Sequence, residues 1–182
     1  MSIAEKNLKP RWDYAAYAAI PYDGRRHEII DAEHFVNPAP SLYHQEISKH
    51  ITFQLYSQIE LNGHGKVFYS PIDLQLSGHD IVQPDIVVVT LKRKHILTPT
   101  KIEGVPDLVI EILSPSNPDH DLKTKRQLYE AAGIPECWIV LPDEHQILQL
   151  QLAEGRYVES VETEAITMKI APHATVDLTR VW

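Results

Sequence analysis

The sequence has little of several features that mark particular classes of protein. It contains a single cysteine, Cys137, which excludes an internal disulfide and is typical of a reducing compartment. No apolar run approaches the roughly 18 residues that cross a bilayer, and the N-terminus lacks the apolar core of a signal peptide. We therefore expect a cytoplasmic protein with no membrane partner.

Other absences narrow the chemistry. The formal net charge of −8 argues against a general nucleic-acid coat protein, because such binding depends on basic residues that release counterions from phosphates. The ten histidines form no HxxxH or HExxH motif, and no cysteine cluster accompanies them, so no zinc site is predicted. There is no glycine-rich phosphate loop and no G-x-S-x-G elbow. Cys137 lies among apolar residues, which predicts a buried, unreactive thiol.

Two short apolar runs carry the acidic residues of interest. The run IVVVT at 86–90 follows Pro84-Asp85 and is typical of a strand buried on both faces. The run at 108–113 is similar but is interrupted by Glu111. Because a carboxylate in a buried strand costs several kcal/mol unless a cation or donors meet it, something must face Glu111.

The two acids predict a metal site if their strands are neighbours. Asp85 stands at the mouth of its strand, behind a proline that marks a strand's beginning. Two carboxylates a few ångströms apart repel each other unless a hard divalent cation such as Mg²⁺ lies between them. A purely structural pair is less favourable, because leucine would fill such a core without the desolvation cost.

A helix is predicted at 121–132, ended by Gly133. Asp121, Lys125 and Tyr129 then share one face at i, i+4 and i+8. A lysine early in a helix opposes the macrodipole, so Lys123 and Lys125 are better placed if acidic groups lie nearby. The alternative is an exposed Asp121/Lys125 ion pair of about 0.2–0.5 kcal/mol.

The order of these motifs resembles the Uma2 family of the PD-(D/E)xK, restriction-endonuclease-like superfamily. The resemblance covers roughly residues 12–155 and rests on PD at 84–85, E-x-L at 111–113, S-P-S at 114–116, D-x-x-x-K-x-x-x-Y at 121–129, G-I-P-E-x-W at 133–138, R-H-E-I-I-D-A-E at 26–33 and His44-Gln45. Departures from the family pattern occur at Ala32, where glycine is common, and at Cys137, where an aromatic residue is common. Both look structural, and Ala32 suggests a slightly different hairpin turn.

The resemblance implies roles for individual residues. Asp85 and Glu111 match the metal-binding acids of the superfamily. Leu113 occupies the usual lysine position, and in Uma2-like proteins that lysine has moved to the following helix, which favours Lys125 and leaves Lys123 open. A further carboxylate is expected from Glu28. A second alternative for it is Glu46 on the first long helix, and His44 is expected close to the site.

The resemblance also implies a fold and a function. It predicts an α/β (α+β) fold with a mixed central sheet flanked by helices, an N-terminal hairpin and extra C-terminal strands. One domain is expected over residues 1–182, with 1–11 as an extension. The implied activity is a Mg²⁺-dependent endonuclease, with Mn²⁺ as substitute, DNA as the favoured nucleic acid and a homodimer as the assembly. The alternative is a non-catalytic binding or assembly module that kept the fold.

The remaining chain indicates a coarse order of elements. We expect helices at 12–19 and from 41 or 42 to about 61, a hairpin at 26–36 turning at Asp31-Ala32, and further strands at 66–69, 73–76, 136–141, 147–152 and 157–161. The 136–141 strand should run parallel to the 108–113 strand, because a helix connects them. Residues 91–104 are long and basic for a connection, and form either a rim for a phosphodiester substrate or a solvated loop. Residues 163–182 show no clear pattern.

Overall fold

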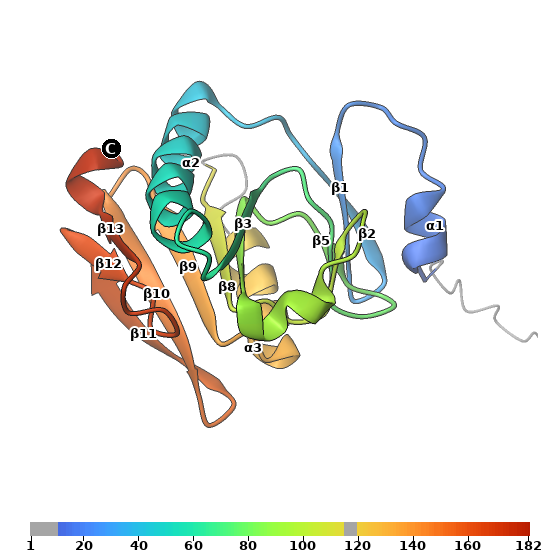
Figure 1. The fold of residues 1–182 in the computed structure, drawn as a ribbon. Coiled ribbons are helices and arrows are strands. Elements are labelled where there is room, and N and C mark those ends of the chain that lie inside the picture. The colour runs from blue at the N-terminus through green and yellow to red at the C-terminus, as the bar shows by residue number, and fades with distance from the viewer. Residues whose placement is uncertain (1–10, 115–119) are drawn as a thin grey trace, which may run out of the picture.

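The structure is a computed structural model that describes residues 11–114 and 120–182. Its strands form a six-stranded sheet, a five-stranded sheet and a small C-terminal pair, with helices packed against them (Figure 1). The expected mixed α+β architecture is therefore confirmed. The predicted N-terminal extension lies outside the described residues except for Arg11, and so do residues 115–118 before the predicted helix. None of the described helices combines the length and apolar character needed to span a membrane.

The six-stranded sheet is the centre of the fold and has the order β11-β10-β9-β8-β6-β3. Its strands are β3 (Gly65–Tyr69), β6 (Ile86–Thr90), β8 (Leu108–Ile112), β9 (Glu136–Leu141), β10 (Gln146–Ala153) and β11 (Arg156–Glu162). Among these described strands only β8 and β9 pair in parallel, as their helical connection predicts. The two strands that carry the acids, β6 and β8, are antiparallel neighbours.

The five-stranded sheet has the order β2-β1-β5-β4-β7. Its strands are β1 (Arg26–Ile30), β2 (Glu33–Asn37), β4 (Leu74–Gln75), β5 (Ile81–Val82) and β7 (Ile102–Glu103). The predicted hairpin is present, and its turn residues Asp31 and Ala32 have φ of 50° and 60°. This left-handed backbone strains alanine but not glycine, which explains why Ala32 is an unusual residue here.

The helices begin and end where local sequence signals place them. The first is α1 (Tyr14–Ala18), and α2 (Leu42–Leu55) continues into η1 (Tyr56–Glu60). The side chain of Ser41 caps α2 by accepting a hydrogen bond from the His44 amide. Between β8 and β9, η3 (His120–Lys125) runs into α3 (Arg126–Ala132), which ends at Gly133 with φ of 78°.

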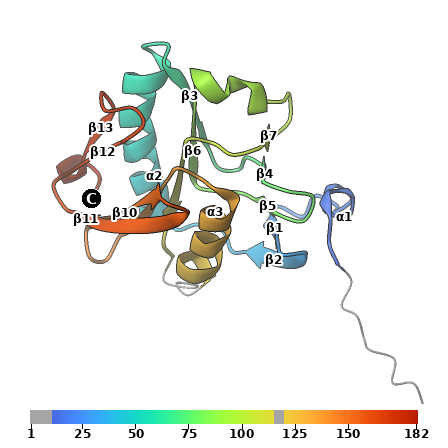
Figure 2. The same ribbon diagram turned by 90° about the horizontal axis from the view of Figure 1, so that it is seen from below.

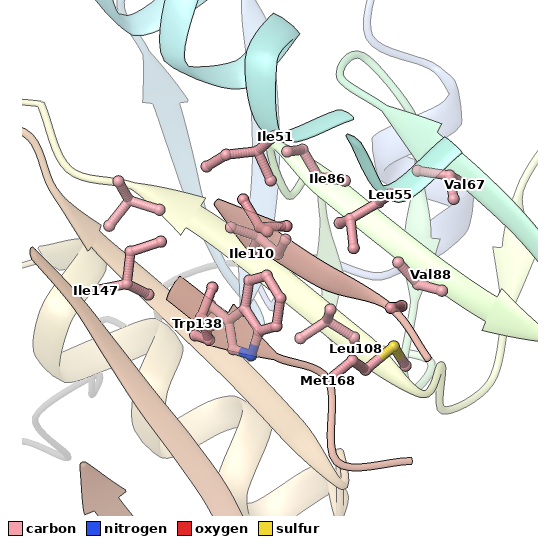
Figure 3. Close-up of a cluster of buried hydrophobic side chains, with 14 of the residues drawn as sticks. Ile51, Leu55, Val67, Ile86, Val88, Leu108, Ile110, Trp138, Ile147 and Met168 are labelled. Atoms are coloured by element: carbon pink, nitrogen blue, oxygen red, sulfur yellow. The ribbon is translucent and has the colours of Figure 1, made fainter. Parts of the chain in front are cut away.

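Alternation along the central strands builds two hydrophobic layers. Even-numbered residues of β6, β8 and β9 pack against α2, whereas odd-numbered residues face α3 and the five-stranded sheet. Figure 2 shows α2 and α3 on opposite sides of the six-stranded sheet. Figure 3 shows the α2 layer, in which Ile51, Leu55 and Trp138 are fully buried. The two carboxylates at odd positions 85 and 111 are therefore directed to the α3 side.

The C-terminal segment, whose structure no sequence pattern predicts, completes the α2 layer. It contains β12 (Ala165–Thr167), β13 (Thr175–Asp177) and η4 (Leu178–Arg180). Its buried residues include Met168, Val176 and Leu178, and β13 contacts α2. Buried Glu136 binds this segment by accepting a hydrogen bond from the Lys169 amide at 2.8 Å. The segment thus shields one flank of α2 from water.

The packing of α2 predicts that a buried leucine contributes much more to the free energy of unfolding than an exposed leucine close to it in the chain. Leu55 is fully buried and Leu61, at the end of η1, is 66% exposed. We expect Leu55→Ala to lower the free energy of unfolding by about 2–5 kcal/mol, because it removes buried methyl groups and leaves a cavity. Leu61→Ala should change it by less than about 0.5 kcal/mol. Urea denaturation followed by tryptophan fluorescence measures both, and equal losses would contradict the assigned layer.

Candidate active site

The register of β6 and β8 places Asp85 and Glu111 opposite each other. Ile86 pairs with Ile110, so position 85, just before β6, lies across from position 111 in the antiparallel register. Residues opposite each other in an antiparallel pair project from the same face of the sheet. Both carboxylates are 3% exposed, and both line one small pocket. The predicted convergence of the two acids is present.

Asp85 is held by three donors from different elements. Arg26 Nη1 of β1 donates to Asp85 Oδ1 at 3.0 Å, and the Ile112 amide donates to Oδ2 at 2.9 Å. His44 Nε2, in the first turn of α2, lies 3.0 Å from Oδ2. Burial alone would raise the pKa of Asp85, but the contacts with His44, Arg26 and the Ile112 amide outweigh it and hold that pKa below its ordinary value.

Glu111 faces the helix that follows its strand. Lys125 Nζ lies 3.2 Å from both carboxylate oxygens, and the Tyr129 hydroxyl donates to Oε1 at 2.5 Å. Lys125 and Tyr129 are four residues apart and share one helical face, as predicted. Burial, reinforced by the charges of Glu111 and Glu28, raises the pKa of Tyr129 well above its ordinary value, so its hydroxyl stays a donor.

Glu28 brings a third carboxylate to the other side of Lys125. Lys125 Nζ lies 2.9 Å from Glu28 Oε1, which also accepts a hydrogen bond from the Gln83 amide at 2.7 Å. Asn37 Nδ2 donates to Glu28 Oε2 at 2.6 Å. Glu28 is fully buried and does not line the pocket. Lys125, itself 2% exposed, therefore bridges two carboxylates from separate sheets.

Lys123 and Glu46, the alternatives to Lys125 and Glu28, lie outside this cluster. Lys123 is exposed, because two residues apart on a helix point to nearly opposite sides. Glu46 is exposed on the outer face of α2, away from the face that packs on the sheet. Lys125 contacts both Glu111 and Glu28, whereas Glu46 lies on the outer face of α2. The side chain of Asp121 lies outside the described residues.

The pocket is small and polar. Its volume of about 30 Å³ admits one water molecule or ion. Its lining comprises Arg26, Asn37, Pro38, Ala39, Pro40, His44, Asp85, Glu111, Ile112, Ser114 and Lys125. His44 Nδ1 is buried and has no hydrogen-bond partner in the described part of the chain. The pocket thus combines carboxylates, cations and a free imidazole nitrogen.

The donor set fits a cation that needs few protein ligands. Among the side chains that the structure describes, which leave out residues 115–122, no three His, Cys, Asp or Glu are arranged to hold a metal. Mg²⁺ commonly takes one or two carboxylates and keeps several waters. Asp85 and Glu111 supply two.

The basic segment 91–104 does not surround this pocket. It begins at η2 (Leu91–Ile96), beyond the end of β6, whereas Asp85 precedes that strand. At about 3.3 Å per residue the two ends lie about 20 Å apart. Arg93 instead pairs with buried Asp107 at 3.1 Å. Of the two alternatives for this segment, a rim around the pocket is therefore not formed by η2, which lies at the end of β6 opposite to Asp85.

Two site residues were not singled out by the sequence. Arg26 and Asn37 belong to the N-terminal hairpin and hold Asp85 and Glu28 respectively. The period of two along β1 puts Arg26 on the same face as Glu28, and this was the available signal. Asn37 pairs across the hairpin with Arg26, a relation that depends on the turn length and register.

The buried cluster predicts that substitutions of Lys125 and Lys123 change the free energy of unfolding by very different amounts. Lys125→Met leaves Glu28 and Glu111 without their shared cation, and we expect it to lower the free energy of unfolding by about 3–5 kcal/mol. Lys123→Met, on the exposed surface, should stay within about 0.5 kcal/mol of the unchanged protein. Chemical denaturation of the two variants compares them directly. A costly Lys123→Met beside a neutral Lys125→Met would refute the assignment.

Asp85 gives a pH-dependent prediction. Its folded-state pKa lies below the ordinary value of 3.8, so its stabilising contribution is complete above that pH and is lost as the pH falls through the lowered pKa. Asp85→Asn should therefore be less stable than the unchanged protein at pH 7, and the difference should shrink below about pH 4. Unfolding measured from pH 7 to pH 3 checks this. A difference that grows toward low pH would reverse the assigned sign.

A solved structure has the same fold. It is the crystal structure of a protein described as a "putative nuclease" from Anabaena variabilis ATCC 29413, which belongs to a family of domains of unknown function. The two chains superpose with a TM-score of 0.76 at 17% sequence identity, over 93% of this chain and 97% of the other. At this identity the likeness shows the fold. No curated protein matches the chain.

The family comparison covers the hairpin, both acidic strands and the helix that carries Lys125. The family Uma2, described as "Putative restriction endonuclease", matches residues 14–178. That range contains every side chain of the buried cluster and almost all of the described fold, so the chain belongs to the Uma2 family.

Proposed function

We propose that the protein is a Mg²⁺-dependent endonuclease that hydrolyses phosphodiester bonds, with DNA as the favoured substrate. The observation that carries this proposal is the pairing of Asp85 and Glu111 across β6 and β8, on one face and in one pocket, with Lys125 beside them. The descriptions of the family and of the similar Anabaena variabilis protein support nuclease chemistry. Mn²⁺ is the expected substitute for Mg²⁺.

In this proposal Asp85 and Glu111 hold the cation. When bound, Mg²⁺ supplies a water of lowered pKa and shields charge on the scissile phosphate. Arg26, His44 and the Ile112 amide keep the Asp85 carboxylate ionised and oriented toward the pocket. Such supporting contacts commonly decide how well a metal-binding carboxylate works.

Lys125 is the residue we assign to the reacting phosphate. Its amine lies in the pocket lining and is fixed from two sides, by Glu111 and by Glu28. A fixed cationic donor orients the attacking water or stabilises the charge that develops on the phosphate oxygens. Glu28 acts as a positioning residue, because it holds Lys125 and does not line the pocket itself.

A non-catalytic module that kept this fold is the second candidate. The observation that favours it is the internal pairing of the cluster, in which Lys125 already contacts both oxygens of Glu111. A metal titration separates the two candidates. Calorimetry with Mg²⁺ and Mn²⁺ should show binding in the unchanged protein and none in Asp85→Asn, whereas no binding in either protein would favour the module.

Cleavage tests the activity itself. With Mg²⁺ or Mn²⁺ and double-stranded DNA, we expect Asp85→Asn to reduce the rate by about 100-fold or more, because a metal ligand is lost. Asp143→Asn, which makes the same chemical change at a turn outside the pocket, should keep the rate. RNA is assayed in parallel to establish the substrate class. Cleavage that survives Asp85→Asn undiminished would exclude the assigned site.

A further inference from the structure

A second depression, distinct from the acidic pocket, lies along the outer face of α2. Its volume is about 750 Å³. It is lined by Leu42, Gln45, Glu46, Ser48, Lys49, Thr52, Phe53, Tyr56 and Tyr69. All but Tyr69 come from α2 and the start of η1, and Tyr69 is the last residue of β3. We call this surface the α2 groove.

The α2 groove exposes large apolar side chains. Leu42 is 87% exposed, Phe53 is 70% exposed and Tyr69 is 66% exposed. These residues are close enough to line one depression, unlike the single exposed apolar residues that most surfaces carry. Large apolar side chains that are exposed side by side mark an interaction surface, whereas single exposed apolar residues occur on most proteins.

The groove residues form a continuous seam on the helix. Positions 42, 45, 49, 52 and 56 alternate in steps of three and four, which is the spacing of a helix-packing seam. The residues that bury α2 in the core, Ile47, Ile51 and Leu55, lie on the opposite face. α2 therefore has two packing faces, and within the described chain only one of them is covered.

Charged side chains that line the α2 groove are placed to match a second copy of the same helix. Glu46 and Lys49 make no ion pair with any side chain that the structure describes. If two α2 helices cross antiparallel about a two-fold axis between positions 47 and 48, Glu46 lies opposite Lys49 of the other copy. The same register places Leu42 opposite Phe53. A single register thus pairs opposite charges with each other and apolar residues with each other.

We propose that the α2 groove is the dimer interface of this protein, formed by two copies of the chain with antiparallel α2 helices. Leu42, Phe53 and Tyr69 expose together about 400 Å² at about 150–250 Å² per large side chain. With the polar groove residues this approaches the roughly 800 Å² per partner of a stable interface. β3 is the outer strand of its sheet in the described structure, so a copy seated beside Tyr69 would also cover an open sheet edge.

The groove chemistry favours a protein over a nucleic acid as its occupant. Glu46 would lie against phosphates, Lys49 is the only Lys or Arg among the described lining residues, and the chain carries a net charge of −8. Nucleic-acid grooves instead combine aromatic residues with several cations that follow the backbone. A second copy satisfies the opposite charges in pairs.

Charge reversal tests the interface through its register. Sedimentation equilibrium of the unchanged protein should show a mass of twice the chain. We expect Glu46→Lys and Lys49→Glu, each alone, to raise the dimer dissociation constant by about tenfold or more, because each sets like charges opposite each other. The double variant restores the opposite pairs and should return the dissociation constant to within about threefold of the original.

Apolar substitutions provide the matched control. Phe53→Asp should give a monomer, whereas Val158→Asp, at a 60% exposed site on β11, should leave the mass unchanged. Circular dichroism of each variant confirms that it is folded. A monomeric unchanged protein at about 50–100 micromolar, a dimer that persists in Phe53→Asp, or a double variant no better than the single ones would each overturn the proposal. So would groove variants that change only the affinity for DNA.

Discussion

The structure depends on one buried lysine held between two carboxylates. Lys125 comes from the junction of η3 and α3, Glu111 from the central sheet and Glu28 from the N-terminal hairpin, and all three are 3% exposed or less. A buried charge is tolerated only with partners at hydrogen-bond distance, so each element must hold its position for the others to stay ionised. The cluster therefore fixes the hairpin and the helix against the sheet, and the same contacts place an amine beside Asp85.

Glu111 and Glu28 take their shared cation from the helix and not from the strand that carries Glu111. Leu113 is 9% exposed and packs in the apolar layer between the central sheet and α3. Leu113 lies on the same face of the sheet as Glu111 but carries no charge, and the helix presents Lys125 to both carboxylates. Tyr129, one turn further along, closes the same side of Glu111. The four-residue spacing of the helix thus places both Lys125 and Tyr129 against Glu111.

The sequence predicted the parts of the site that depend on short-range patterns. The proline before Asp85, the interrupted strand at Glu111 and the helical spacing of Lys125 and Tyr129 are all local, and the structure has each of them. It did not separate Lys125 from Lys123, because that choice depends on how the helix is rotated against the sheet. It also left open whether the basic segment forms a rim or a solvated loop, since the end of a sheet at which a long connection lies is set by strand direction. The C-terminal segment packs against α2 through buried residues at irregular spacing, which no periodicity reveals.

The two surfaces of α2 connect the site to the proposed assembly. His44, in its first turn, contacts Asp85, while the opposite face of the helix forms the α2 groove. In the antiparallel register the His44 positions of two copies are seven residues apart along the helix axis, which is about 10 Å at 1.5 Å per residue. Because His44 lies on the face of α2 opposite the groove, a pair of α2 helices would direct the two pockets to opposite sides of the helix pair.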